Sequence, residues 1–347
     1  MKKARSILII ITAVFILVLV LISFYIFSHH SSTKRIYEKT RFIMGTLVSI
    51  SVVCGNRNQA MSAMDEAFRV LQETEDQTSK KIPTSFTSQV NDAAGKGAVS
   101  APAFFIELLQ KSLEYSHLSH GAFDVTIGPI TALWNFEDGQ GDLPDSGAIE
   151  QKLPLVDYRG LILDKEHRIV ELKKPGAMID LGGIAKGFGV DRAVSALKGK
   201  GIAGGIVNAG GDVRLFGKKP GGKIWHVGIQ HPRRTNEILA SLKLTDKSIV
   251  TSGDYERFFL WANVRYHHIL DPKTGWPAKG CQSVTIVSQT ALEGDALSTS
   301  VFILGTEKGM ALIEKLPHVE GLIVDGQGKV HISKGLKSSL LWRENSN

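Results

Sequence analysis

The apolar residues of the chain begin with one long stretch that differs from everything after it. Residues 7–27 are apolar apart from Thr12 and Ser23, and three basic residues precede them. A helix rising about 1.5 Å per residue over this length spans roughly the 30 Å core of a bilayer. Because no Ala-x-Ala cleavage pattern follows, we expect residues 1–28 to be an uncleaved, single-pass anchor rather than a signal peptide. The basic residues predict a cytoplasmic N-terminus, with the rest of the chain on the extracytoplasmic side.

Two later segments carry apolar side chains at helical spacing. The first predicts an amphipathic helix whose stripe faces the core and consists of Met61, Met64, Phe68 and Leu71. The second has Pro102 in its first turn, and its core positions are Phe105, Leu108, Leu109 and Leu113. Polar, turn-forming residues predict loops at 78–88 and 137–147.

Short segments that are β-branched or alternate in polarity predict strands. One runs from Leu47 to Val53, and the others lie at 205–208, 224–230, 239–244, 248–252, 258–261 and 283–288. Many short strands with a few long helices indicate an α+β fold. There is no internal repeat and no long linker, so we expect one domain over residues 40–340, joined to the anchor by a polar tether over residues 29–39.

Composition and charge narrow the class of protein. The chain has 347 residues, 43% of them hydrophobic, which is enough for a sizeable core. Three positive charges lie in residues 1–28, so the net charge of +7 leaves +4 for the rest of the chain. This mild excess, without a basic run interleaved with aromatic residues, argues against nucleic-acid binding. Cys54 and Cys281 have no metal-ligand spacing, and either one disulfide or two buried thiols would fit them.

A glycine-rich turn at residues 180–191 is the first candidate for chemistry. It reads Asp-Leu-Gly-Gly-Ile-Ala-Lys-Gly-Phe-Gly-Val-Asp, follows a short apolar segment and opens a predicted helix. Glycine lets the backbone approach an anion closely, and the N–H groups of a helix start face that anion with a favourable dipole. The turn matches neither the Gly-x-Gly-x-x-Gly nor the Gly-x-x-x-x-Gly-Lys-Ser/Thr nucleotide motif. By itself it indicates either an anion site or close packing.

A histidine pair and a carboxylate occur in segment 265–276. Adjacent residues of a strand point to opposite faces, so one of His267 and His268 can face a cleft while the other is buried. Asp271 stands in an Asp-Pro-Lys-Thr-Gly turn, where it can act simply as a turn cap. No further histidine lies at a metal-ligand spacing, which argues against a transition-metal site.

A third candidate lies at the start of a predicted helix. Asp295 and Thr299 are four residues apart and share one helix face, with Ser298 beside them. A carboxylate together with hydroxyl oxygens suits a hard cation such as Mg²⁺. The alternative is a first-turn acid that favours the helix dipole, with the hydroxyls bonded to the helix backbone.

Seven short motifs, taken together and in order, resemble the ApbE family of FAD:protein FMN transferases over roughly residues 40–335. They read Met44-Gly-Thr46, Gly121-Ala-Phe-Asp124, Asp180-Leu-Gly-Gly-Ile-Ala-Lys-Gly187, Asn208-Ala-Gly-Gly-Asp212, Thr251-Ser-Gly-Asp254, His267-His-Ile-Leu-Asp-Pro-Lys-Thr-Gly275 and Asp295-Ala-Leu-Ser-Thr299. The resemblance implies a single T-fold-related α+β domain with mixed or antiparallel sheets and flanking helices. It also implies an Mg²⁺-dependent enzyme whose substrate is FAD. Such an enzyme joins FMN through a phosphoester to a Ser or Thr hydroxyl of an acceptor protein and releases AMP.

The same resemblance implies roles for individual residues. His268 would assist the acceptor hydroxyl, and Asp295 would act at the reacting phosphate by holding the metal. The implied flavin contacts are Met44, Ala122, Phe123, Asp124, Asp180, Lys186 and Leu270. The implied metal ligands are the Gly183 carbonyl, Asp295, Ser298 and Thr299. The acceptors would be exported or membrane proteins, which agrees with a catalytic domain anchored outside the bacterial cell membrane.

Two departures from the family pattern and two alternative functions remain. Many members reach the membrane through a cysteine just after the apolar run, whereas no cysteine precedes Cys54 here. Many also have an aromatic flavin contact where this chain has Lys81. The alternative functions are a metal-dependent FAD pyrophosphatase, which would yield free FMN and AMP, and a membrane-tethered flavin-binding module without catalysis.

Overall fold

The computed structural model describes residues 12, 14–20, 34–136, 139 and 141–342. Most of the predicted anchor at residues 1–28 lies outside the described residues, and its described part is helical and exposed. Membrane anchoring therefore stays a prediction. Among the described residues, one helix has the length and hydropathy to span a membrane, α8 (Ala291–Ile313), and much of it is buried inside the domain.

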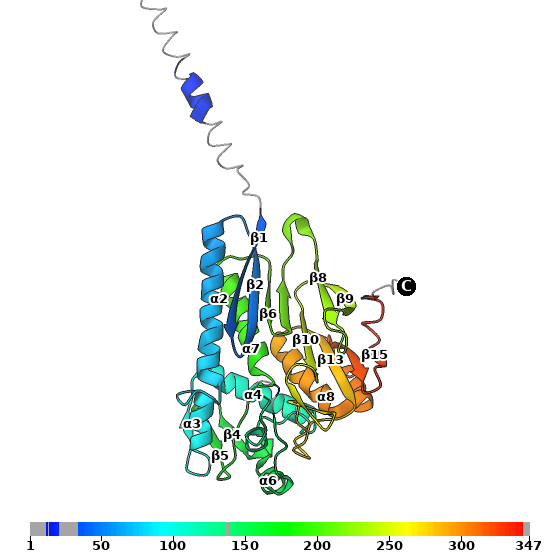
Figure 1. Cartoon of the computed structure of the whole chain (residues 1–347). Helices are drawn as coiled ribbons and strands as arrows, with labels where there is room; N and C mark the ends of the chain where they lie inside the picture. The colour runs from blue at the N-terminus through cyan, green and yellow to red at the C-terminus, as the bar shows by residue number, and fades with distance from the viewer. Residues whose placement is uncertain (1–11, 13, 21–33, 137–138, 140, 343–347) are drawn as a thin grey trace, which may run out of the picture.

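An eight-stranded sheet forms the centre of the domain (Figure 1). In spatial order its strands are β1 (Arg35–Ile43), β2 (Thr46–Cys54), β6 (Gly205–Ala209), β7 (Asp212–Phe216), β10 (Ser248–Gly253), β13 (Cys281–Ser288), β14 (Glu320–Asp325) and β15 (Val330–Ile332). Every pairing is antiparallel. Parallel pairing occurs among the described residues only as an isolated bridge between Ile127 and Met178. The expected α+β fold with antiparallel sheets is confirmed.

Three long helices cover one face of this sheet. They are α2 (Arg57–Thr78), α7 (Ala185–Gly199) and α8, with α7 packed between the other two (Figure 1). The stripe predicted for the first helix is confirmed, because Met64, Phe68 and Leu71 are fully buried and Met61 packs partly buried against the same core. Asn56 caps α2 by accepting the Gln59 N–H at 3.0 Å.

Smaller elements complete the domain. The other face of the sheet is covered by a three-stranded sheet of β16 (Leu340–Trp342), β9 (Ile238–Leu244) and β8 (Trp225–Gln230). A separate hairpin pairs β11 (Phe258–Trp261) with β12 (Val264–His267). The lower part of Figure 1 contains α3 (Phe86–Asp92), α4 (Ala103–Leu118), α5 (Gly128–Thr131), α6 (Ser146–Lys152) and a sheet of β3 (Val99–Ser100), β5 (Ile169–Leu172) and β4 (Leu161–Asp164). Short 3-10 helices in the described residues include η2 (Leu153–Leu155), η3 (Tyr158–Gly160) and η4 (Pro220–Gly222).

Three segments differ from the sequence-based expectations. The tether expected at 29–39 overlaps strand β1, which begins at Arg35 because it pairs along its whole length with β2. The loop expected at 78–88 contains the first turn of α3, which Ser85 caps. The loop expected at 137–147 gives way to α6, which Asp145 caps. Cys54 and Cys281 are both buried and free, which is one of the two alternatives left open.

The contact between α7 and α8 leaves no space for a side chain at Gly187. A Cβ there would lie 2.3 Å from the Ala291 carbonyl oxygen. Asp191 of α7 also fixes the two helices by accepting the N–H groups of Ala291 and Leu292 at 3.0 and 2.9 Å. We therefore expect Gly187→Ala to lower the free energy of unfolding by about 2–3 kcal/mol, measured by denaturant titration.

Gly199 provides the matched control for this prediction. It ends the same helix, and a Cβ there would meet nothing within 4 Å. Gly199→Ala should leave stability unchanged or raise it by up to about 1 kcal/mol. Equal unfolding curves for the two variants would contradict the proposed steric role of Gly187.

Candidate active site

The Asp180 carboxylate organises the start of the glycine-rich turn. Its Oδ1 accepts the Gly182 N–H at 2.9 Å, and its Oδ2 accepts Lys80 Nζ and Thr131 Oγ1, both at 2.7 Å. Burial opposes the charge of Asp180, but Lys80 and these hydrogen bonds outweigh burial and hold the pKa of the carboxyl below its ordinary value. Asp180 therefore fixes the shape of the turn.

Gly183 and Gly187 lie where the turn becomes α7. A regular helix would bond the Gly187 N–H to the Gly183 carbonyl, but that N–H donates instead to Asp295 Oδ2 of α8 at 3.0 Å. Among the described residues, no other backbone N–H outside the regular helices and strands donates to the Gly183 carbonyl in its place. A Cβ at Gly183 would lie 3.2 Å from the Phe123 ring and 3.4 Å from Thr299 Oγ1. The Gly183 backbone thus lies beside predicted metal ligands, with its carbonyl released from helix bonding.

Two buried carboxylates share one ammonium group next to this turn. Lys186 Nζ lies 3.0 Å from Asp212 Oδ2 and 3.6 Å from Asp295 Oδ1. Burial opposes the charge of Lys186, but the two carboxylates outweigh burial and raise the pKa of its ammonium group. Burial and the negative charge of Asp295 raise the pKa of Asp212 well above its ordinary value. Two carboxyl groups thus crowd one ammonium group, an arrangement that favours a proton or a bound cation between them.

Three hydroxyl groups lie at the edge of this cluster. The Ser298 hydroxyl donates to the Asp295 carbonyl at 3.0 Å and lies 2.8 Å from the hydroxyl of Ser252 in β10. Ser252 Oγ is in turn 3.5 Å from Thr299 Oγ1. The hydrogen bond from Ser298 to the Asp295 carbonyl fits the alternative interpretation of this segment, in which its hydroxyls bond to the helix backbone. Thr299 Oγ1, by contrast, faces Gly183.

The donor set suits a hard divalent cation. The Gly183 carbonyl, the Asp295 carboxylate and the hydroxyls of Ser298 and Thr299 present only oxygen atoms, which Mg²⁺ prefers. A bound cation would also relieve the repulsion between the two carboxyl groups that share Lys186. The described part of the chain holds no cluster of three His, Cys, Asp or Glu side chains that could bind a metal. A cation here would complete its coordination with water and substrate phosphate.

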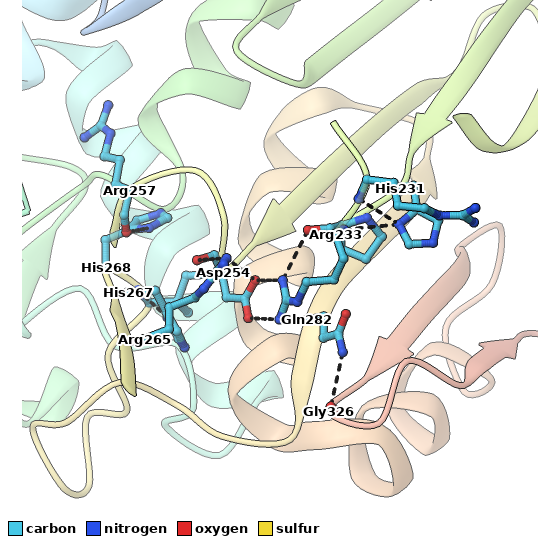
Figure 2. A network of polar contacts seen from close by, with 12 residues as sticks. His231, Arg233, Asp254, Arg257, Arg265, His267, His268, Gln282 and Gly326 are labelled. Carbon is cyan, nitrogen blue, oxygen red and sulfur yellow. Dashed lines mark hydrogen bonds and ion pairs between the residues drawn. The ribbon is translucent and has the colours of Figure 1, made fainter. Parts of the chain in front are cut away.

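His267 and His268 have different surroundings at the end of β12. His267 is buried, its Nε2 donates to the Ala278 carbonyl at 3.0 Å, and its Nδ1 accepts the Ile269 N–H at 3.3 Å. His268 is half-buried, and its Nδ1 lies 3.2 Å from the Arg257 carbonyl, to which it must donate (Figure 2). This bond leaves His268 Nε2 unprotonated, the form that a general base requires. Burial and the charge of Arg257 lower the pKa of His268 to about 3, so its imidazole is neutral at pH 7.

Arg257 links His268 to the turn that contains Met44. The Arg257 carbonyl also accepts the His268 backbone N–H at 3.0 Å, and the guanidinium reaches the Gly45 carbonyl at 3.5 Å. Met44 has a φ of 57°, and its N–H donates to Glu75 Oε2 at 2.9 Å. The charge of Arg257 acts on both His268 and Lys186, so the histidine and the carboxylate cluster share one electrostatic environment.

Asp254 anchors the segment that carries these groups. Its two carboxylate oxygens accept both terminal nitrogens of Arg233 at 2.6 Å, and Arg265 lies 3.4 Å from the first of them (Figure 2). Its N–H donates to the Gln282 carbonyl at 3.0 Å. Asp254 therefore ties the end of β10, the β8–β9 connection and the β11–β12 hairpin together just before Arg257.

The remaining predicted flavin contacts separate into two groups. Phe123 and Ala122 are buried, with Phe123 next to Gly183. Asp124 accepts hydrogen bonds from three nearby groups of the chain, and Leu270 lies in a different buried cluster around aromatic side chains. The predicted residues that the structure brings together are Gly183, Phe123, Lys186, Asp295, Ser298 and Thr299.

Three residues at the site carry no role in the sequence analysis. Lys80 points to Asp180, whereas its neighbour Lys81, at the position where the resemblance led us to expect an aromatic flavin contact, is exposed. Ser252 lies within the Thr251-Ser-Gly-Asp254 motif, and Arg257 follows it by three residues. That motif was the sequence feature that could have drawn attention to both. Lys80 has no comparable motif, and its role follows from a contact between residues 100 positions apart.

The amino-acid sequence of this chain is similar to those of known proteins of one family. The sequence model of the ApbE family matches residues 44–323. An FAD:protein FMN transferase of Treponema pallidum is 34% identical over 319 residues, which cover 87% of this chain and 88% of that relative. Another, of Klebsiella pneumoniae, is 31% identical and covers 84% and 90%.

Solved structures agree with these sequence relatives. The crystal structure of the ApbE protein of Thermotoga maritima has a TM-score of 0.82 at 33% identity and covers 89% of this chain and 100% of its own. The flavin transferase ApbE of Vibrio cholerae has a TM-score of 0.78 at 27% identity and covers 88% and 99%. This chain is a member of the ApbE family.

Proposed function

We propose that this protein transfers FMN from FAD to a Ser or Thr hydroxyl of an acceptor protein and releases AMP. Relatives named FAD:protein FMN transferase support the proposal. The observation that carries it is a neutral, oriented imidazole, His268, that shares its electrostatic environment with a buried oxygen-donor cluster around Asp295. Phosphoryl transfer to a hydroxyl needs a proton acceptor and charge neutralisation of this kind.

In the proposed reaction, the acceptor oxygen attacks the phosphorus of the FMN half of FAD. A phosphoester bond forms, the pyrophosphate P–O bond to AMP breaks, and the hydroxyl proton moves to His268 Nε2. A hard cation such as Mg²⁺, held by Gly183, Asp295, Ser298 and Thr299, would neutralise phosphate charge when bound. The water-poor surroundings of Asp295 strengthen each electrostatic contact there.

Other side chains position the substrate in this proposal. Lys186 balances the carboxylate charge of the cluster, and the turn shaped by Asp180 presents the start of α7 to an anion. Arg257 lies at the Gly45 carbonyl, where its guanidinium can meet a phosphate oxygen. Flavin contacts through Met44, Ala122, Phe123, Asp124 and Leu270 belong to the same proposal.

The location and partners are part of the proposal as well. The apolar run supports a single-pass anchor over residues 1–28 at the bacterial cell membrane, with the catalytic domain over residues 40–340 on the extracytoplasmic side. Exported or membrane proteins would then be the acceptors. The low net charge outside the anchor supports the absence of nucleic-acid partners.

The full chain incubated with FAD, Mg²⁺ and an exported candidate acceptor tests this function. We expect flavin fluorescence on the denatured acceptor, a mass increase equal to one FMN, and one AMP released per flavin attached. Free FMN and AMP without labelled acceptor would instead indicate an FAD pyrophosphatase. Bound FAD with no AMP release would indicate a flavin-binding module.

The pKa of His268 leads to a prediction for the pH profile. The reactive form is unprotonated, and a pKa of about 3 keeps it unprotonated from pH 8 down to pH 5. We therefore expect kcat/KM for FAD, which reports the free enzyme, to show no acidic limb near the ordinary histidine pKa of about 6.5. Initial rates between pH 5 and 8 measure this. A tenfold fall in rate per pH unit below pH 6.5 would show that the imidazole is not held neutral.

A further inference from the structure

One end of the central sheet gathers basic side chains from four separate segments. The start of β1, the end of β2, the start of β6 and the end of β7 meet there, because Arg35 pairs with Cys54, and Gly205 pairs with both Val52 and Phe216. This is the end at which the chain enters the domain, at the top of Figure 1. We call it the entry face, comprising residues 34–37, 55–58, 198–204 and 217–224.

The first two segments place three cations around the start of α2. Lys34 and Arg35 open β1, Arg57 is the first residue of α2, and all three are exposed. The first turn of α2 contains no acidic residue, so the positive end of the helix dipole adds to these charges. Arg35 and Arg57 also line a shallow hollow of about 460 Å³.

The third segment adds two lysines from the end of α7. Lys198 and Lys200 are exposed, and the Lys200 carbonyl accepts Gln59 Nε2 at 3.1 Å, which places this segment beside the first turn of α2. Lys198 Nζ lies 5.5 Å from the centre of the Phe216 ring. These lysines complement the C-terminal dipole of α7, and they also extend the entry face towards β7.

The fourth segment is a loop with both charge and an apolar side chain. It reads Gly-Lys-Lys-Pro-Gly-Gly-Lys-Ile over residues 217–224. Lys218 and Lys223 are exposed, Lys219 lies 5.4 Å from the centre of the Trp225 ring, and Ile224 is 47% exposed. A flexible turn that presents lysines around an exposed aliphatic side chain is suited to the interface between lipid headgroups and acyl chains.

The entry face carries no carboxylate in any of its four segments. Of the nearby acids, Asp65 pairs with Lys39 and Arg41, and Glu66 pairs with Arg69. A third, the exposed Asp246, accepts the Gly217 N–H at 3.0 Å at the edge of the fourth segment. None of the eight basic side chains of the face forms an ion pair within the part of the chain that the structure describes. With eight basic side chains against one bordering carboxylate, Asp246, and the partial influence of Lys200 on Glu66, the face is strongly positive, and a surface of negative charge would complement it.

The chain that precedes Lys34 identifies that surface. Residues 28–33 separate the apolar run from the entry face and can extend no further than about 20 Å. Lys34 and Arg35 therefore stay close to any bilayer that holds the apolar run. We propose that the entry face binds the anionic headgroups of that bilayer and sets the orientation of the domain on it. This inference does not depend on the flavin chemistry.

A dye at the fourth segment tests this docking on the full chain. Ile224→Cys can be labelled selectively with an environment-sensitive fluorophore, because Cys54 and Cys281 are buried. The labelled protein is placed in nanodiscs of phosphatidylcholine, with or without phosphatidylglycerol. We expect emission about twofold higher in the anionic discs, and we expect the difference to vanish in about 1 M salt, where the Debye length is about 3 Å.

Two double charge variants distinguish lipid binding through the entry face from an effect of the protein's net charge. Lys218→Glu with Lys223→Glu should abolish the difference between the two discs. Lys165→Glu with Lys173→Glu changes the net charge equally but lies in exposed positions at the opposite end, directly after β4 and β5, and should leave the difference intact. Equal emission in both discs, or equal loss in both double variants, would overturn the proposal.

Lys218→Gln with Lys223→Gln provides a neutral version if charge reversal prevents folding. If the apolar run does not insert, the same comparison on vesicles tests the entry face alone.

Discussion

Asp295→Asn is expected to lower the rate of covalent flavin transfer about a thousandfold, corresponding to several kcal/mol of lost charge stabilisation. Asparagine retains an oxygen that can accept the Gly187 N–H, so the link between α7 and α8 survives. What it removes is the negative charge that would hold a cation beside the Gly183 carbonyl. The rate at saturating FAD, measured across a Mg²⁺ titration, checks this expectation.

Asp212→Asn is the matched control for this experiment. Asp212 is equally buried and contacts the same ammonium group of Lys186, but it lies outside the proposed donor set. It should weaken transfer less, and the Mg²⁺ concentration for half-maximal rate should rise only in Asp295→Asn. If the two variants respond alike to Mg²⁺, Asp295 contributes only charge to the cluster and is not a ligand.

His268→Ala is expected to reduce transfer by about 10²–10⁴-fold, the usual contribution of a positioned general base. FAD binding should change little, because His268 is not one of the predicted flavin contacts and its ring bonds to the Arg257 carbonyl. Added imidazole should recover part of the lost rate, since it can occupy the space of the missing ring. Single-turnover rates with and without imidazole measure both effects.

The neighbouring histidine distinguishes a chemical role from a structural one. His267 uses both ring nitrogens in bonds to the backbone, to Ala278 and Ile269. His267→Ala should therefore lower the free energy of unfolding by about 1–3 kcal/mol, and imidazole should not restore its rate. Rescue of His267→Ala but not of His268→Ala would reverse the assignment of the two residues.

The fold was predictable where the spacing of apolar residues in a segment matches the side chains that the folded domain buries. The stripe of α2 and the alternation in β2 each follow from the spacing of their own side chains. Strand β1 was not predicted, because Arg35 to Lys39 are mostly polar and exposed. These residues form a strand only because β2 supplies a partner along the whole hairpin. Strand formation there depends on a pairing that a single segment does not reveal.

The site was predictable to the extent that motifs mark it. The segments around Gly183, His268 and Asp295 were singled out from residue types and spacing, and the family resemblance assigned their roles. The bonds that shape the site were not, because Lys80 to Asp180 and Gly187 to Asp295 join positions about 100 residues apart. The turn-cap interpretation of Asp271 is confirmed, because its Oδ1 accepts the Lys273 N–H at 2.9 Å.

The length of the β1–β2 hairpin has a consequence for the choice of acceptor. The nine residues of β1 run from within the entry face to the Met44 turn, a span of about 30 Å in an extended strand. With the entry face on the bilayer, the hairpin acts as a rigid spacer that holds the reaction centre at that height. An acceptor would then be selected by the distance of its hydroxyl from the bilayer surface as well as by its local sequence. Lengthening or shortening an acceptor's stalk would change its labelling without altering a single contact at the reaction centre.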